Sequence, residues 1–172
     1  MAIRSICILP DPILTRRTQK VTTFNDSLTK LVEDMVDTMR DANGVGLAAN
    51  QVGVSLRVAV IEMPDEEEGS GKVHVLINPE ILRCEGEREV VEGCLSIPGY
   101  RGTFKRSMKV RVRARDLDGK EIRFRAENNL LAEALEHEID HLNGVLYIDH
   151  LDSQDALELI PTTDVDDSDV DE

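Results

Sequence analysis

Aromatic residues are scarce in this chain: phenylalanine, tyrosine and tryptophan make up 3% of its 172 residues, and tryptophan is absent. Hydrophobic residues still amount to 41%, which is enough apolar material for a core. Aliphatic side chains must therefore fill most of that core. The length fits one domain, because typical domains have about 100–200 residues.

Positive charge is also in short supply. The chain has 20 Lys and Arg residues against 34 Asp and Glu, a net charge of −14. A nucleic-acid-binding domain needs a basic surface, and an anionic membrane attracts basic segments. We therefore expect no direct binding to nucleic acid and none to a membrane. The acidic runs at 65–68 and 164–172 are expected to be a solvated loop and part of a tail.

Long apolar runs are missing as well. No stretch approaches the ~18 residues of a membrane span, and the first residues do not have the pattern of a signal peptide. We expect a cytoplasmic protein, or one of an organellar matrix if this is a processed form. Three cysteines, an odd number, argue against a disulfide framework and for free thiols or a metal thiolate.

Hydrophobic periodicity outlines the secondary structure. Apolar residues at i, i+3, i+4 and i+7 predict a helix over 27–42 that Gly44 ends. A second helix is predicted to begin at Asn128 or Asn129, either of which can act as N-cap, and to end at Gly144. Runs rich in β-branched residues predict strands over 56–63, 73–77, 87–91, 109–114 and 121–125.

Turn residues complete this outline. Asn78-Pro79 is predicted to end the strand before it, and Asp118-Gly119 is predicted to form a tight hairpin. The predicted fold class is α+β: mostly antiparallel strands packed around a long C-terminal helix, with an N-terminal helix. Residues 1–151 are expected to form a single catalytic domain, and 152–172 a short acidic tail, partly disordered.

The most informative pattern is His137-Glu138-Ile139-Asp140-His141. Two histidines four residues apart lie on the same face of a helix, so both imidazoles can reach one metal ion. The glutamate after the first histidine lies where a general base for an activated water is needed. The pattern predicts metal-assisted hydrolysis without naming the substrate.

A catalytic site of this kind needs a third protein ligand and an open position for water or substrate. Tyr147 stands where one protease pattern has a histidine, and Glu158 is a second downstream candidate. Cys94 is the third, since Gly93 before it allows close backbone approach and a metal-bound cysteine is a thiolate. The spacing alone leaves these options open.

Three segments together resemble one enzyme family. Residues 44–51 (GVGLAANQ) resemble its GxGLAAxQ motif, residues 92–96 are identical to its EGCLS motif, and 137–141 match its HExxH helix. They occur in the family's order and at similar spacing, and the similarity extends from Leu9 to about Leu151. On these motifs the chain resembles the peptide deformylases of the bacterial and organellar type.

The resemblance implies a reaction and its residues. The family removes the formyl group from N-formylmethionine at the start of newly made polypeptides. It implies one divalent metal ion per chain, with the ligands Cys94, His137 and His141. Fe²⁺ is the family's common metal, and one thiolate with two imidazoles also suits Zn²⁺, Ni²⁺ or Co²⁺. Glu138 is implied as general acid and base, with the Gln51 side chain and the Leu95 backbone N–H stabilising the oxyanion.

The resemblance also implies how the formyl-methionyl peptide binds, namely as an added strand with the methionine side chain in an apolar pocket. The implied contacts with the peptide are Val45, Gly46, Gly93 and Arg101. The implied pocket wall includes Val45, Val90, Leu130 and Ala134.

Two features depart from the family. Glu133 lies one helical turn before His137, where an apolar or basic residue is usual, and we expect it to face solvent or pair with an arginine. Some relatives carry a basic C-terminal helix that touches the ribosome. The acidic tail here would be repelled by RNA phosphates, so we do not expect docking at the ribosomal exit region through the tail.

Three other interpretations follow from the same residues. A metalloprotease would take Tyr147 or Glu158 as third ligand and leave Cys94 without a role. A structural zinc site would need a fourth ligand, which is not evident. A cysteine hydrolase with Cys94 as nucleophile would be insensitive to chelators.

Overall fold

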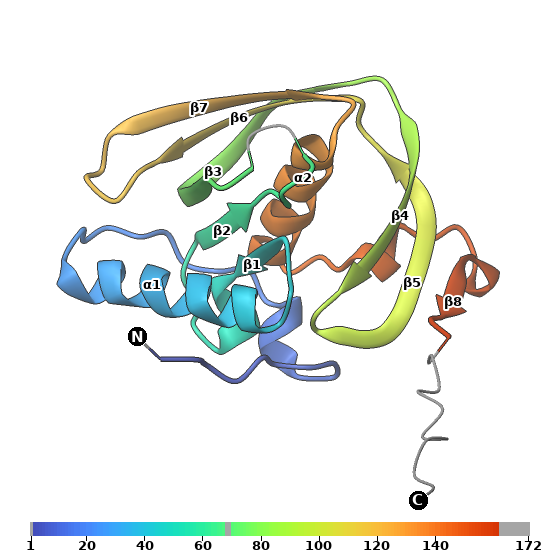
Figure 1. The fold of residues 1–172 in the computed structure, drawn as a ribbon, viewed down its shortest axis with the longest axis horizontal. Helices are drawn as coiled ribbons and strands as arrows, with labels where there is room; N and C mark the ends of the chain where they lie inside the picture. The colour runs from blue at the N-terminus through green and yellow to red at the C-terminus, as the bar shows by residue number, and fades with distance from the viewer. Residues whose placement is uncertain (1, 68–69, 162–172) are drawn as a thin grey trace, which may run out of the picture.

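The computed structural model describes residues 2–67 and 70–161, which form two sheets around a central helix (Figure 1). The larger sheet has the strand order β1-β2-β3-β6-β7 and the smaller one β4-β5-β8. The strands are β1 (Gly46–Ala48), β2 (Val58–Glu62), β3 (Val73–Glu85), β4 (Arg88–Cys94), β5 (Ile97–Arg106), β6 (Lys109–Arg115), β7 (Glu121–Glu127) and β8 (Leu157–Leu159). The helices are α1 (Asp26–Asp41) and α2 (Leu130–Leu142), with 3-10 segments η1 (Pro12–Thr15), η2 (Ala49–Val52), η3 (Tyr147–His150) and η4 (Gln154–Ala156). The strands pair antiparallel, and the predicted α+β class is confirmed.

Helix α1 begins where the sequence predicts. Asn25 is its N-cap, and the Asn25 side chain accepts the backbone N–H of Leu28 at 3.1 Å. One face of the helix is buried against β1 and β2, through Leu28, Leu31, Val32, Met35 and Met39. The prediction of a helix over 27–42 is confirmed to within one residue at each end.

Helix α2 carries the histidine pair and lies between the two sheets. The side chain of Asn129 caps its start by accepting the N–H of Ala132 at 2.9 Å. Just past its end, Gly144 has a φ of +75° and packs so closely on the backbone of Thr15 that a Cβ would collide with it. Both predicted ends are confirmed, and both ends of the helix are fixed in place.

Strand β3 is longer than predicted. The sequence predicts an end at Asn78-Pro79, yet the strand continues to Glu85. The register with β6 shifts between Ile77 and Glu80, and Asn78 has a φ of +51°. A bulge therefore takes the proline that a regular ladder would not accept, and the predicted end was wrong.

Three strands lie where the sequence pattern predicted none. Strand β1 comes from the glycine-rich stretch expected to be a loop, and β5 follows a two-residue turn after β4. Strand β8 lies inside the expected tail and pairs with β5, with Leu159 opposite Tyr100. Residues 152–161 therefore contribute to the smaller sheet, and the rest of the expected tail lies outside the described residues.

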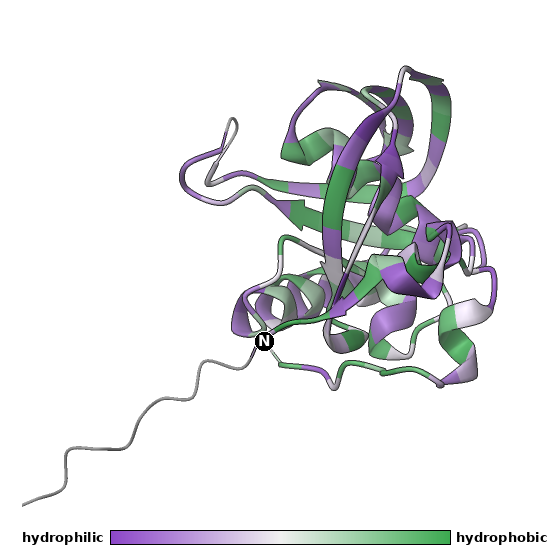
Figure 2. Ribbon diagram, turned by 90° about the vertical axis from the view of Figure 1, so that its right-hand side faces the viewer, coloured by the Kyte–Doolittle hydropathy of each residue, from purple (hydrophilic) through white to green (hydrophobic). Residues whose placement is uncertain are grey.

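The core is mostly aliphatic, as the composition predicts. Among the described residues, the buried hydrophobic side chains are aliphatic apart from Phe104 and Tyr147. Figure 2 shows hydrophobic and hydrophilic residues alternating along the strands, the pattern of sheets with one face buried. One cluster packs α2 onto the larger sheet and another packs the smaller sheet on the segment after α2, so both sheets meet at α2.

Two further expectations can be compared with the structure. Within the described ranges, the helices are too short or too polar to cross a membrane. Cys7, Cys84 and Cys94 are all free thiols, which confirms the prediction that the odd cysteine count reflects no disulfide framework.

Candidate active site

Three potential metal ligands converge between β4 and α2. His137 and His141 lie one turn apart on α2, and Cys94 lies at the end of β4. The Nε2 atoms of the two histidines are 3.1 Å apart, and the Cys94 Sγ is 3.3 Å from Nε2 of His141. All three ligand atoms lie within 4.8 Å of one another. One thiolate and two imidazoles in this arrangement can hold a divalent transition-metal ion.

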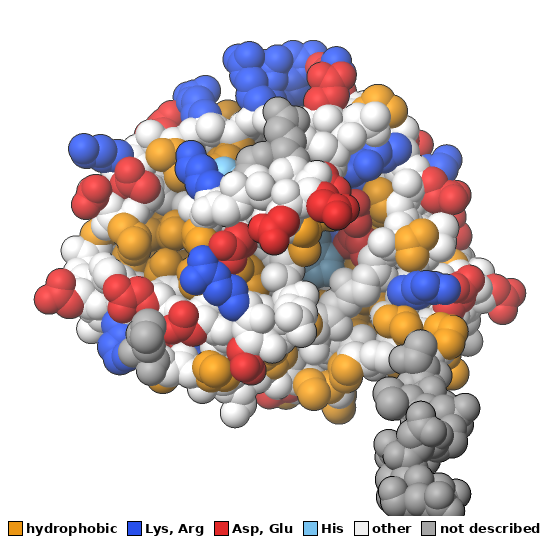
Figure 3. All heavy atoms as spheres, in the orientation of Figure 1, with side chains coloured by type: hydrophobic (Ala, Val, Ile, Leu, Met, Phe, Trp, Pro, Cys, Tyr) orange, Lys and Arg blue, Asp and Glu red, His pale blue; other side chains and the backbone are white. Residues whose placement is uncertain are grey.

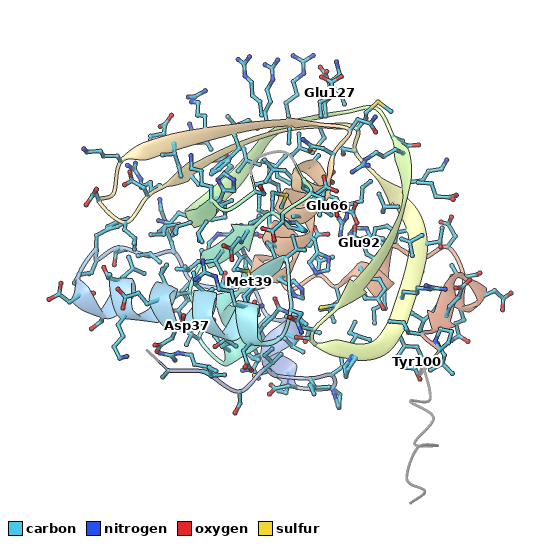
Figure 4. The ribbon with its side chains drawn as sticks, viewed as in Figure 1. Asp37, Met39, Glu66, Glu92, Tyr100 and Glu127 are labelled. Carbon is cyan, nitrogen blue, oxygen red and sulfur yellow. The ribbon has the colours of Figure 1, made fainter. Side chains whose placement is uncertain are left out.

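The carboxylate of Glu92 sets the orientation of His137. Its Oε1 lies 2.6 Å from Nδ1 of His137, which leaves Nε2 of this histidine to face the ligand group. Arg106 donates from Nη2 to the same Oε1 at 2.9 Å and from Nη1 to Asp140 at 2.9 Å. Figure 4 shows Glu92 between β4 and α2. Burial alone would raise the pKa of Glu92, but the hydrogen bonds from Arg106 and His137 lower it below its usual range.

Glu138 is buried beside the ligand group. Its side chain lines the same cavity, and its Oε2 has no hydrogen-bond partner among the described residues. Burial raises the pKa of Glu138 to about 7, and the negative charge of Glu92 acts in the same direction. A carboxyl group with such a pKa can both accept and donate a proton near neutral pH.

Gln51 presents its amide N–H₂ to the same centre. The Gln51 Oε1 accepts the backbone N–H of Ala48 at 3.0 Å, which fixes the orientation of the amide. Its Nε2 then lies 3.1 Å from Ser96 Oγ and 3.7 Å from Cys94 Sγ. The buried η2 turn thus aims a hydrogen-bond donor at the place where negative charge would develop beside the ligands.

A cavity of about 460 Å³ opens at these residues, within the range of small-ligand sites. Figure 3 shows histidine side chains at the bottom of a hollow, with acidic side chains near its rim. Strands β1 and β4, which are the outer strands in the described parts of their sheets, contribute opposite walls. Two unpaired strand edges facing one cavity can receive an extended peptide.

The structure brings most of the predicted site residues to this cavity. Those that line it are Val45, Gly46, Gln51, Gly93, Cys94, Leu95, Leu130, Ala134, His137 and Glu138. His141 is buried directly behind the wall. Val90 instead points into the core beneath the smaller sheet, and its neighbour Val91 lines the cavity. Arg101 is half-exposed and pairs with Glu158 at 3.3 Å.

Glu133 takes a position that combines both expectations for it. Its side chain lines the cavity and also lies 3.6 Å from the guanidinium of Arg88. Burial raises the pKa of Glu133 above its usual range, and the nearby charge of Glu92 adds to this effect. The pocket wall therefore carries a carboxyl group only partly balanced by its arginine.

The two alternative third ligands lie elsewhere. The Tyr147 hydroxyl is buried in the core of the smaller sheet, stacked near Phe104. Glu158 is exposed on β8 and paired with Arg101. Among the described residues, the cluster with ligand geometry is the one formed by Cys94 and the two histidines. This arrangement disfavours a metalloprotease that leaves Cys94 unused.

The sequence analysis assigned no role to Glu92, Arg106 or Asp140, although they form a buried ion network around His137. Glu92 is the first residue of the EGCLS motif, so a signal was present in its case. Arg106 and Asp140 are buried partners brought together from β5 and α2, which no local pattern indicates.

Known proteins with the same sequence and fold identify the family. The family model described as polypeptide deformylase matches residues 3–156. A peptide deformylase of Dehalococcoides mccartyi is 49% identical over 164 residues, 95% of each chain, and one of Thermomicrobium roseum is 44% identical over 94% of this chain and 93% of its own.

Solved structures agree with these sequence matches. The peptide deformylase of Legionella pneumophila has a TM-score of 0.82 and 50% identity, covering 87% of this chain and 86% of its own. That of Ehrlichia chaffeensis, solved in complex with actinonin, has a TM-score of 0.84 and 39% identity over 90% and 91% of the two chains. The chain therefore belongs to the peptide deformylase family of hydrolases, which remove the formyl group from the N-terminal methionine of newly made polypeptides.

Proposed function

We propose that the formyl group is hydrolysed at one divalent metal ion held by Cys94, His137 and His141. The observation that carries the proposal is the convergence of one sulfur and two Nε2 atoms on a cavity that also contains the unpartnered carboxylate oxygen of Glu138. A divalent ion bound there supplies Lewis acidity, because it lowers the pKa of water and polarises a carbonyl.

Glu138 acts first as general base and then as general acid. Its carboxylate takes a proton from the attacking water as the new C–O bond forms at the formyl carbon. It then delivers that proton to the methionine nitrogen as the C–N bond breaks, which releases formate and a free amine. The pKa of about 7 suits both transfers near neutral pH.

Gln51 and Leu95 stabilise the oxyanion that forms from the formyl oxygen. The Gln51 amide is held by its bond from Ala48, so its N–H₂ needs no reorientation during the reaction. The Leu95 backbone N–H, in the turn between β4 and β5, is the second donor. Loss of one such donor typically slows a reaction by about 10²-fold or more.

The peptide lies between β1 and β4 as an added strand. The backbone of Val45, Gly46 and Gly93 offers hydrogen-bonding groups at these edges, and Leu130 and Ala134 contribute the apolar wall for methionine. Val90 supports this wall from the core side. Arg101 lies further along β5 and contacts the downstream part of the peptide.

Fe²⁺ is the proposed ion in the cell, with Zn²⁺, Ni²⁺ and Co²⁺ as substitutes that the same ligands accept. The proposed location is the cytoplasm, or an organellar matrix if this is a processed form. The partner is the formyl-methionyl nascent peptide as it leaves the ribosome, met without a contact through the acidic tail.

The test is formate release from a formyl-methionyl tripeptide by protein prepared without oxygen. Wild type is compared with Glu138→Gln and Cys94→Ala, and metal content is measured on each sample. We expect Glu138→Gln to keep its metal and to lose about 10²–10⁴-fold in kcat. We expect Cys94→Ala to lose metal as well as activity.

Glu127→Gln, an exposed glutamate on β7, is the matched control and should behave as wild type. Full activity of metal-free protein, or of the Cys94→Ala variant without metal, would overturn the proposed metal site. Full activity of Glu138→Gln would overturn the role of the carboxylate.

A further inference from the structure

The cavity extends beyond the groups that the reaction uses. Past Cys94 and Leu95 its wall continues along Pro98, Gly99 and Tyr100 of β5, and it ends at Ile160. Ile160 comes directly after β8, the C-terminal strand that the sequence pattern did not predict. Figure 4 shows Tyr100 at the end of β5 that lies near β8, away from Glu92. The far end of the cavity is thus built partly by the C-terminal segment.

Pairing with β5 fixes Ile160 in this position. Leu159 is the β8 partner of Tyr100, and the N–H of Ile160 donates to the carbonyl of Gly99 at 2.9 Å. Antiparallel pairing places Ile160 on the same side of the sheet as Gly99. A Cβ built on Gly99 would meet no atom within 4 Å, so the space beside Ile160 is open.

The surface at this end is apolar and exposed. Val91 is 57% exposed and Ile160 44% exposed, and both line the cavity. Exposed apolar side chains that share one concave surface commonly mark a binding site. Leu159, the neighbour of Ile160, is even more exposed at 70%, but it points to the other face of β8 and does not line the cavity.

We propose that Ile160, together with Val91 and Gly99, forms a subsite for an apolar side chain at one of the two positions that follow formylmethionine in the substrate. The inference rests on the proposed binding of the peptide between β1 and β4. The subsite is continuous with the cavity that holds the reacting group, so the peptide already bound there is its occupant. The C-terminal strand β8 thereby contributes to substrate preference.

The experiment measures kcat/KM for formate release with two peptide series, formyl-Met-Xaa-Ala and formyl-Met-Ala-Xaa, where Xaa is Leu, Ser or Asp. The full chain is used as wild type, Ile160→Ser, Ile160→Leu and Leu159→Ser. Burial of part of a leucine side chain predicts that wild type prefers Leu over Ser by about 5-fold in one series. Ile160→Ser should reduce this preference to less than about 2-fold, and Ile160→Leu should retain it.

Leu159→Ser is the matched control, because it removes an exposed leucine from the same strand without touching the cavity. It should keep both the rate with formyl-Met-Ala-Ala and the preference for leucine. Equal rates for all Xaa in wild type, or a preference that Ile160→Ser leaves intact, would overturn the subsite while the proposed function stands. Failure of metal-loaded wild type to release formate from any peptide would overturn the proposed function and the subsite with it.

Discussion

Gly46 lies directly against the carboxylate of Glu138, and a Cβ at position 46 would overlap with Oε1 of that glutamate. The glycine is on the outer strand β1 and the glutamate on α2, so this contact joins the larger sheet to the catalytic helix. The absence of a side chain at position 46 therefore determines where the proposed general base is placed.

Gly46→Ala should lower kcat by about 10²-fold, because the Cβ displaces the carboxylate that transfers the proton. The fold should tolerate the change, since the displaced atoms belong to the end of a side chain. Formate release and thermal unfolding are the measurements. In the double variant with Glu138→Gln, the two losses should be far from additive. Additive losses would show that position 46 acts independently of Glu138.

Glu92→Gln should weaken metal binding by about 10–100-fold, because the carboxylate that orients His137 and increases its basicity is lost. The contact is the 2.6 Å one between Glu92 Oε1 and His137 Nδ1. Competition with a chelator measures the change, and circular dichroism checks that the variant folds with Arg106 left less well paired. Unchanged metal affinity in a folded variant would contradict the role given to Glu92.

The sequence predicted those parts of the fold that depend on local patterns. Both helices follow from apolar periodicity and from capping by Asn25 and Asn129. It did not predict that β3 continues past Pro79, because the bulge that tolerates the proline depends on pairing with β6. Strand β8 was missed for a similar reason: its three residues are stabilised by β5 and have no pattern of their own.

The site was predictable to the extent that it lies in contiguous motifs. Cys94, His137 and His141 could be named as ligand candidates, yet only the fold brings the cysteine to the histidines. The ion pair of Arg106 with Glu92 and Asp140 depends on β4, β5 and α2 meeting at one point. Alternation along β4 also decides that Val91, and not Val90, faces the cavity.

Glu133→Leu should increase discrimination at the methionine pocket. The carboxyl group of Glu133 lines the cavity and lies 3.6 Å from Arg88, so it tolerates a cationic side chain better than an apolar wall would. The ratio of kcat/KM for formyl-methionyl over formyl-lysyl peptides should rise about 10-fold. Glu127→Leu, on exposed β7, is the control for loss of one negative charge. An unchanged ratio would mean that Glu133 does not contact the first side chain.

Asp34→Asn should make stability less dependent on acid pH. Asp34 is 2% exposed on α1 and accepts hydrogen bonds from the N–H of Ala2 at 3.0 Å and from Arg4 Nε at 3.1 Å. Burial alone would raise the pKa of Asp34, but these bonds and Lys30 lower it below its ordinary value of about 3.9. The folded state thus binds this proton less readily than the unfolded state does.

The sign of the effect follows from this lowered pKa. The stabilisation is fully present above the unfolded-state value of about 3.9 and is lost as the pH falls through the folded-state pKa of Asp34. The difference in free energy of unfolding between wild type and Asp34→Asn should therefore be largest near neutral pH and shrink in acid. Urea unfolding at a series of pH values measures it, with Asp37→Asn on the same helix as the control for loss of one charge. A difference that grows in acid would contradict the lowered pKa, because it would require the folded state to bind the proton more tightly than the unfolded chain.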